Sequence, residues 1–133
     1  MIKIGRRGSL SGKIEIIGTQ GHIAYPHLSN NPINTMVAIC KKLKAKRFDK
    51  GNKNFQPSNL EFTSINVDNK AHNVIPARVR AQFNIRYNNL HTSSSLKKKV
   101  SLIVKKMSKK SKCSYKIDSV SYTHLTLPTI GCV

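Results

Sequence analysis

The sequence predicts an α+β fold in which two helices lie on one face of a four-stranded antiparallel sheet. Segments whose hydrophobic residues recur every second position, as in a half-buried strand, alternate along the chain with segments of helical period. Two consecutive strand-like segments separate the helical segments, and a further strand-like segment lies toward each end. The 133 residues leave room for one domain with one hydrophobic core.

The first half of the chain is expected to contain one strand and one helix. Apolar and polar side chains alternate over residues 9–17, which predicts a strand that ends at Gly18, and the aperiodic segment after it should be a loop. Asn31 and Pro32 mark a helix start, because the Asn side chain can accept from free N–H groups and proline loses only a donor without a partner. The helix should extend to about Arg47. Its buried stripe should consist of Ile33, Met36, Val37, Cys40 and Leu43.

The second half of the chain is expected to contain three strands and another helix. Residues 60–67 are rich in strand-forming residues, and residues 79–87 alternate strictly between apolar and polar side chains. Thr92 or Ser93 can cap the second helix. Its apolar stripe should consist of Leu96, Val100, Ile103, Val104 and Met107. Residues 115–120 are the fourth expected strand.

The order of the expected elements is strand, helix, strand, strand, helix, strand. This is the order of the ferredoxin-like split βαβ sandwich, in which both helices cover the same face of an antiparallel sheet. Residues 122–133 follow the last strand without a hydrophobic period and should contribute no clear element.

The charge of the chain is strongly unbalanced, with 24 lysines and arginines against 5 acidic residues and a net charge of +19. Such an excess raises the question of a nucleic acid or an anionic surface as partner. An RNA-binding module on this fold would need aromatic side chains on the open sheet face, whereas Phe83 and Tyr87 share the apolar face. A solvated helix face accounts for the lysines between Lys97 and Lys112, so nucleic acid is not the expected partner.

The sequence favours a cytoplasmic protein. No stretch approaches the roughly 18 apolar residues that a membrane span needs, and the residues after Met1 lack the apolar core of a secretory signal. Three cysteines at wide spacing, Cys40, Cys113 and Cys132, match neither a disulfide framework nor a metal-binding pair. A membrane partner is therefore not expected.

Residues suited to metal or nucleophilic chemistry are few and scattered. The five acidic residues and five histidines fall on separate expected elements, without HExxH or a comparable ligand spacing. The sequence contains neither a GxSxG turn nor a cysteine with a nearby base. A metal site made by this chain alone is therefore not expected.

Three segments resemble the M20 family of metallo-aminoacylases and peptidases, and within it the succinyl-diaminopimelate desuccinylases. They are residues 2–12 (IKIGRRGSLSG), residues 21–32 (GHIAYPHLSNNP) and residues 73–86 (NVIPARVRAQFNIR), and the likeness extends over residues 2–117. The resemblance implies the dimerisation or lid domain of such an enzyme. In the family this domain is inserted between two halves of a catalytic domain and pairs with a second lid to form a homodimer.

The resemblance also implies a division of the chain. Residues 1–8 would be a hinge segment from the catalytic domain, residues 9–121 the lid domain, and residues 122–133 a tail foreign to the family. The parent enzyme would hydrolyse N-succinyl-LL-2,6-diaminopimelate to succinate and LL-2,6-diaminopimelate, a step of lysine and diaminopimelate biosynthesis. Two zinc ions per parent subunit, one of them exchangeable for cobalt, would be bound by the missing catalytic domain, and the chain alone would be inactive.

The resemblance also implies roles for single residues. His22 would reach into the partner subunit's active site and stabilise the oxyanion that forms on the scissile carbonyl, for which an imidazole N–H is a suitable donor. Arg86 would bind a substrate carboxylate through its planar guanidinium, and Asn73 would hydrogen-bond substrate. Further contacts to this dicarboxylic amide would come from Lys3, Arg6, Ser9 and Tyr25.

Several alternatives stay open at this point. Another M20 deacylase or peptidase, such as an acetylornithine deacetylase, would share the lid fold. A basic RNA-binding module of the ferredoxin-like class and a dimerising protein without chemistry are two further alternatives. His22 could also be a loop histidine that only packs or caps. His72 and residues 67–70 depart from the family pattern next to Asn73.

Overall fold

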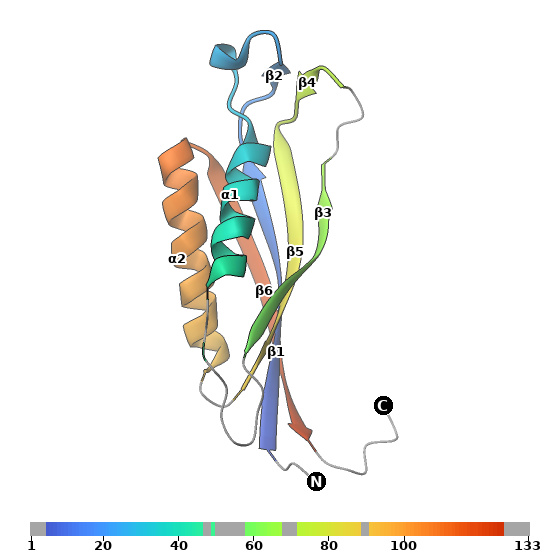
Figure 1. Ribbon diagram of the computed structural model, residues 1–133, viewed down its shortest axis with the longest axis vertical. Helices are drawn as coiled ribbons and strands as arrows, with labels where there is room; N and C mark the ends of the chain where they lie inside the picture. Colours follow the sequence, from blue (N-terminus) through green and yellow to red (C-terminus); the bar gives the residue numbers. More distant parts are fainter. Residues whose placement is uncertain (1–4, 47–48, 50–57, 68–71, 89–90, 127–133) are drawn as a thin grey trace.

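The computed structural model confirms the predicted α+β class, with two helices on one face of a four-stranded antiparallel sheet (Figure 1). It describes residues 5–46, 49, 58–67, 72–88 and 91–126. The strands of the sheet lie in the order β3-β5-β1-β6. This order, with the two outer strands coming from the middle and the end of the chain, is that of the ferredoxin-like fold.

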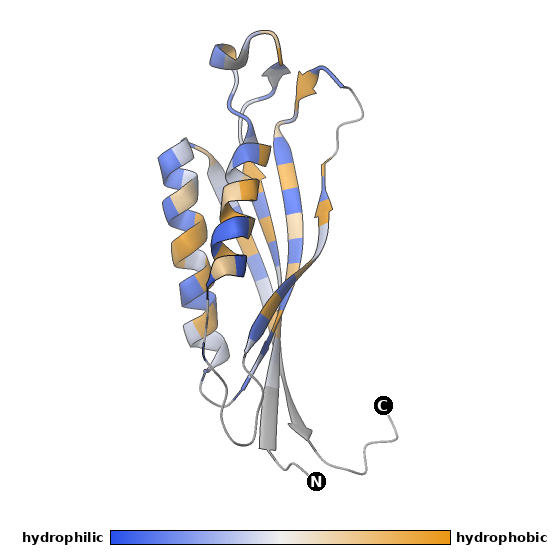
Figure 2. Ribbon diagram, viewed as in Figure 1, coloured by the Kyte–Doolittle hydropathy of each residue, from blue (hydrophilic) through white to orange (hydrophobic). Residues whose placement is uncertain are grey.

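The two central strands of the sheet, β1 and β5, are long. β1 (Gly5–Ile17) pairs with β5 (Arg78–Tyr87) on one side and with β6 (Ser114–Thr126) on the other, and β3 (Asn59–Asn66) pairs with the free edge of β5. The alternation predicted for β5 is confirmed, because its apolar side chains are buried and its polar ones lie on the open face. Figure 2 shows this alternation as successive orange and blue bands along β5.

The two helices begin where the sequence places their caps. α1 (Pro32–Ala45) follows Asn31, whose side chain accepts from the Ile33 N–H, and α2 (Ser93–Ser111) follows Thr92. Thr92 and Ser95 hydrogen-bond each other's backbone in a capping box. None of the described helices is long and apolar enough to cross a membrane.

The buried face of α1 differs by about one position from the predicted stripe. Val37 is exposed, whereas Ile39 is fully buried between the helix and the sheet. Pro32, Met36, Ile39 and Leu43 recur at spacings of three and four, so they define the core face. The prediction for Val37 was therefore wrong, because both stripes fit a helical period and only contact with the sheet selects one of them.

The segment between β1 and α1 is more ordered than the loop expected there. It contains a short strand, β2 (Gly21–His22), and a 3-10 helix, η1 (Pro26–Leu28). β2 pairs with a second short strand, β4 (Val74–Ile75), which lies just before β5. These elements form the end of the molecule that is uppermost in Figure 1, away from the amino terminus. We call this end the tip and the opposite end the base.

The sheet is longer at the base than the sequence predicts. β6 continues to Thr126, so residues 122–126 belong to a strand, against the expectation that they contribute no element. Their partners are residues 5–9 of β1, part of which had been assigned to a hinge segment. The remaining residues of the expected tail, 127–133, lie outside the described residues.

The core lies between the sheet and the helices. Buried side chains come from each layer, and at their centre are Leu10, Ile14, Met36, Ile39, Val79, Phe83, Ile85, Leu96, Val100 and Val104. Phe83 and Tyr87 lie across two glycines of β1: a Cβ atom added at Gly8 would lie 1.9 Å from the Tyr87 ring, and one at Gly12 would lie 2.3 Å from the Phe83 ring. These rings therefore occupy the volume that side chains on β1 would need.

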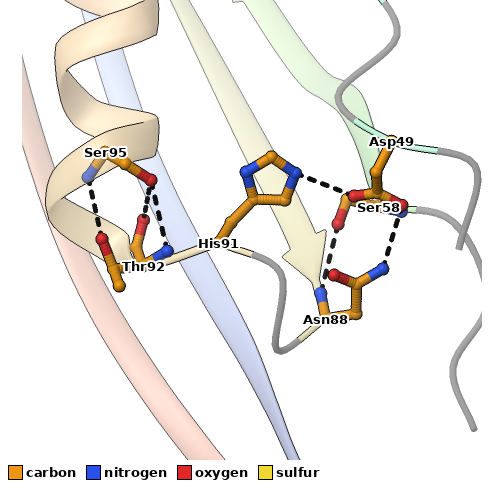
Figure 3. A network of polar contacts seen from close by, with 6 residues as sticks. All are labelled: Asp49, Ser58, Asn88, His91, Thr92 and Ser95. Carbon is orange, nitrogen blue, oxygen red and sulfur yellow. Dashed lines mark hydrogen bonds and ion pairs between the residues drawn. The ribbon is translucent and has the colours of Figure 1, made fainter. Parts of the chain in front are cut away.

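A buried polar network closes the base of the domain (Figure 3). One carboxylate oxygen of Asp49 accepts from the Ser58 backbone N–H at 3.1 Å and from the Asn88 amide at 2.9 Å, and the other lies 2.8 Å from Nε2 of His91. The side chains of Asp49 and His91 are each 8% exposed. The network thus joins the segment after α1, the start of β3 and the connection from β5 to α2.

Candidate functional site

The residues singled out from the sequence fall into two groups at opposite ends of the sheet. His22 lies in β2, Tyr25 in the turn after it, and Asn73 directly before β4, and we call these three residues the tip cluster. Ser9 and Arg86 face each other across β1 and β5 and belong to what we call the base cluster. Eight strand residues separate Ser9 from the tip end of β1, which corresponds to about 26 Å.

The β2–β4 ribbon brings His22 and Asn73 together although 51 positions separate them in the sequence. His22 pairs with Val74 across the ribbon, and the Ile23 N–H donates to the Asn73 carbonyl at 3.1 Å. The Asn73 side-chain amide lies 3.3 Å from Nε2 of His22. The other ring nitrogen, Nδ1, accepts from the Ala24 backbone N–H at 3.0 Å.

The tip also exposes an unusual amount of apolar surface. Tyr25 lies 6.0 Å from His22 and 6.5 Å from His27, measured between ring centroids, and its backbone N–H donates to the His22 carbonyl. Ile23, Tyr25 and Leu28 are each more than half exposed. An imidazole surrounded by exposed apolar side chains suits a loop that another surface covers.

The base cluster is organised by Asn84, which the sequence reasoning did not single out. The Asn84 amide donates to Oγ of Ser9 at 3.0 Å and to Oγ of Ser11 at 2.9 Å, while its carbonyl oxygen accepts from Nε of Arg86 at 3.0 Å. Arg86 is exposed, and Ser9 is 5% exposed. Strict alternation places Asn84 and Arg86 on the same face of β5, and this was the signal that could have identified Asn84.

For two other residues predicted to bind substrate, the structure gives at most the position of the backbone. Arg6 lies in β1 opposite Leu125, which brings its backbone to the base. Lys3 lies outside the described residues. Tyr25 is at the tip, so the predicted set is divided between the two ends and does not form one site within the chain.

Beside the base cluster the open sheet face forms a hollow of about 510 Å³. Asn84 and Ser11 belong to its lining, together with Lys13, Gln82, Asp118 and Val120. Farther along the same face Glu15 accepts from Nε of Arg80 at 2.7 Å. Most side chains named on the open face are thus polar, although Val120 is exposed there, and both Phe83 and Tyr87 are buried on the opposite side.

Neither cluster is arranged as a metal centre or a nucleophile. Within the described ranges, no group of three or more His, Cys, Asp or Glu side chains is placed to hold a metal ion. Burial raises the pKa of the Cys40 thiol above its ordinary value, which disfavours the reactive thiolate. What the geometry offers is hydrogen-bond donors: an imidazole at the tip, and an arginine with two hydroxyls at the base.

Comparisons with known proteins identify the family of the chain. A family model described as a peptidase dimerisation domain matches residues 4–112. The chain is 56% identical over 118 residues to a succinyl-diaminopimelate desuccinylase of Pelagibacter ubique, and 60% identical over 95 residues to one of Ehrlichia chaffeensis. These alignments cover 89% and 71% of the chain, but only 31% and 25% of the relatives.

Solved structures share the fold at low sequence identity. A putative aminohydrolase from methicillin-resistant Staphylococcus aureus superposes with a TM-score of 0.75 at 17% identity, over 90% of this chain and 31% of that one. The aminopeptidase PepT from Bacillus cereus gives a TM-score of 0.72 at 12% identity, over 90% of this chain and 33% of that one. In sequence and in fold, the chain belongs to the peptidase dimerisation domain family of the M20 enzymes.

Proposed function

We propose that this chain is the lid part of a zinc-dependent amide hydrolase that converts N-succinyl-LL-2,6-diaminopimelate and water to succinate and LL-2,6-diaminopimelate. The proposed reaction belongs to lysine and diaminopimelate biosynthesis in the cytoplasm. The observation that carries the proposal is the 56% identity over 89% of the chain to a relative named for this activity. Because the chain spans about a third of that relative, the catalytic machinery itself would lie in other segments.

The separation of the two clusters supports a homodimer in which each active site takes residues from both lids. An extended substrate of this kind is about as long as a four-residue peptide, roughly 14 Å. The tip and base clusters of one chain are at least about 26 Å apart along β1, so one substrate molecule cannot contact both. A second copy related by a twofold axis can supply the missing cluster to each site.

The proposed roles follow from the donors that each cluster presents. At the tip His22 would donate from its imidazole to the carbonyl oxygen of the scissile amide as negative charge develops there, while Asn73 and Tyr25 would contact substrate beside it. At the base Arg86 would pair with a substrate carboxylate, with Ser9, Arg6 and Lys3 as further polar contacts. We do not assign zinc to any residue of this chain, since no described cluster fits it; zinc bound elsewhere would supply an activated water.

Mixed dimers test this division of residues between subunits. The full-length Pelagibacter ubique relative would be prepared as a heterodimer, with one subunit carrying the equivalent of His22→Ala and the other the equivalent of Arg86→Ala. In the proposed arrangement one of the two sites receives an intact His22 and an intact Arg86, so turnover should recover to about half that of the unsubstituted dimer. Each homodimeric variant should have lost most of its activity, by about 100-fold or more for His22→Ala.

Two results would contradict the proposal in different ways. A heterodimer as inactive as the homodimeric variants would show that both clusters serve the same subunit's site. Normal turnover by the His22→Ala homodimer would remove the oxyanion role. A preference of the unsubstituted enzyme for acetylornithine over the succinylated substrate would favour the deacetylase alternative. The 133-residue chain by itself, with zinc added, should show no turnover.

A further inference from the structure

Both ring nitrogens of His22 have hydrogen-bonding neighbours in the structure. Nδ1 accepts from the Ala24 N–H, two residues along the chain, at 3.0 Å. Nε2 faces the Asn73 side-chain amide at 3.3 Å, across the β2–β4 ribbon. The ring is therefore held from one side by its own turn and from the other by a segment 51 positions away.

The contact with Ala24 determines which nitrogen carries the proton. A backbone N–H can only donate, so Nδ1 must present its lone pair and cannot carry a hydrogen. A neutral imidazole has one N–H, which then lies on Nε2. The turn after β2 thus selects the tautomer with a donor at the outer end of the ring.

The proton on Nε2 in turn determines how the Asn73 amide is oriented. An NH₂ group opposite an N–H would place two donors against each other, whereas the amide oxygen can accept. The two ends of an amide exchange by a half-turn about its last torsion, and the hydrogen-bond network decides between them. The structure has Nδ2 of Asn73 at 3.3 Å from Nε2 of His22, so the amide has to make this half-turn to present Oδ1 to the Nε2 proton.

We propose that Asn73 is a positioning residue, which accepts from Nε2–H of His22 and holds that donor in a fixed direction until substrate takes its place. This inference rests on the role of His22 proposed above and gives Asn73 an effect on the reaction through His22, in place of a direct contact with substrate. The backbone supports it, because the Ile23 N–H donates to the Asn73 carbonyl at 3.1 Å and fixes the spacing between the two segments. A donor that already has the right orientation needs little reorganisation when charge develops on the substrate oxygen.

Nuclear magnetic resonance on the uniformly ¹⁵N-labelled 133-residue chain tests the geometry without any catalysis. We expect the proton on Nε2 of His22, and a scalar coupling across the hydrogen bond between the Ala24 amide nitrogen and Nδ1. Asn73→Ala should speed the exchange of the Nε2 proton with water, and Asn73→Asp, which keeps an acceptor, should not. His27→Gln in the same turn is the matched control and should leave the His22 signals unchanged. A proton on Nδ1, or unchanged exchange in Asn73→Ala, would overturn the proposal.

Kinetics of the full-length Pelagibacter ubique relative test whether Asn73 acts through His22. The equivalent of Asn73→Ala should lower kcat by about 10- to 100-fold and leave KM within about twofold, because a misdirected donor weakens transition-state stabilisation and not substrate binding. Asn73→Asp should restore part of kcat. The double variant His22→Ala/Asn73→Ala should be no slower than His22→Ala alone.

The outcomes separate this inference from the proposed function. Additive losses in the double variant, or a rise in KM without a fall in kcat, would show that Asn73 contacts substrate on its own and would overturn the positioning role. Normal turnover by His22→Ala would instead refute the catalytic role of His22, and the resonance experiment would still decide whether Asn73 holds the ring.

Discussion

At position 12 of β1, an aromatic ring on the neighbouring strand leaves room only for glycine. The Phe83 side chain crosses the backbone at this position, so a Cβ atom would lie 2.3 Å from its Cζ atom. Phe83 is 2% exposed and has little free volume into which to move. Packing thus explains two glycines of the GRRGSLSG segment, Gly8 and Gly12.

We predict that Gly12→Ala destabilises the domain by about 1–3 kcal/mol, because the added methyl group forces the Phe83 ring out of its packed position. Urea unfolding of the full chain measures the loss. Lys13→Ala, on the exposed face of the same strand, is the matched control and should change stability by less than about 0.5 kcal/mol. Equal effects of the two substitutions would show that the ring adapts without cost.

For single residues, the sequence predicts the candidate site residues more readily than it predicts the groups that hydrogen-bond to them. Motif resemblance singled out His22, Asn73 and Arg86, but the amide of Asn84 and the backbone N–H of Ala24 carry the contacts that orient them. The contacts of Asn84 with Ser9 and Ser11 depend on the register between β1 and β5, which no local pattern encodes. The Ala24 contact depends on the conformation of the turn after β2, a segment in which the sequence shows no hydrophobic period.

Among the elements, the connections at the base depend on one buried carboxylate and its hydrogen-bond partners. Asp49 and His91 are joined at 2.8 Å, and Ser58 and Asn88 bind the other oxygen of the same carboxylate. These residues come from three separate connections, so a change at one of them should loosen the junction of α1, β3 and α2.

We predict that His91→Ala destabilises the domain by about 3 kcal/mol, because it removes one hydrogen-bond partner from a buried carboxylate. Chemical denaturation measures the change in the free energy of unfolding. His72→Ala replaces an exposed histidine and should have a much smaller effect. If Asp49→Asn/His91→Ala is as unstable as His91→Ala alone, the loss does not come from the buried charge of Asp49.

Element boundaries were predictable where local chemistry sets them and not where pairing does. Asn31 and Thr92 cap their helices as the sequence indicates, since each cap bonds only within its first turn. The end of β6 at Thr126 was missed, because an edge strand is specified by the strand beside it more than by its own alternation. The choice between Val37 and Ile39 likewise needed the sheet against which α1 packs.

Over the whole molecule, positive charge accumulates on the helices. α1 and α2 contain no acidic residue, and the acidic side chains of the described sheet include Glu15 and Glu61, which are bound to Arg80 and Lys44. With a net charge of +19 the folded chain repels itself more strongly than its expanded unfolded state does.

We predict that raising NaCl from about 0.1 M to about 1 M increases the free energy of unfolding, because the screening length falls from about 10 Å to about 3 Å. Urea midpoints at the two salt concentrations measure the effect. A variant with Lys98→Gln, Lys105→Gln and Lys109→Gln, three exposed positions of α2, should show a weaker dependence on salt. A midpoint that stays constant or falls in the parent chain would contradict self-repulsion.

β1 runs without interruption for 13 residues from the base toward the tip. A strand of this length spans about 40 Å, so a rotation at one end displaces the other end. Tilting its lower end by about 5° would move its upper end, which leads into β2 and His22, by about 3 Å. In the role proposed for His22, an error of about 1 Å in aim would slow the reaction about 100-fold. β6 pairs with residues 5–9 of β1, and β5 also pairs with β1 from Gly8 onward. The pairing therefore restrains the lower end of β1, where a small rotation would have the largest effect at the tip.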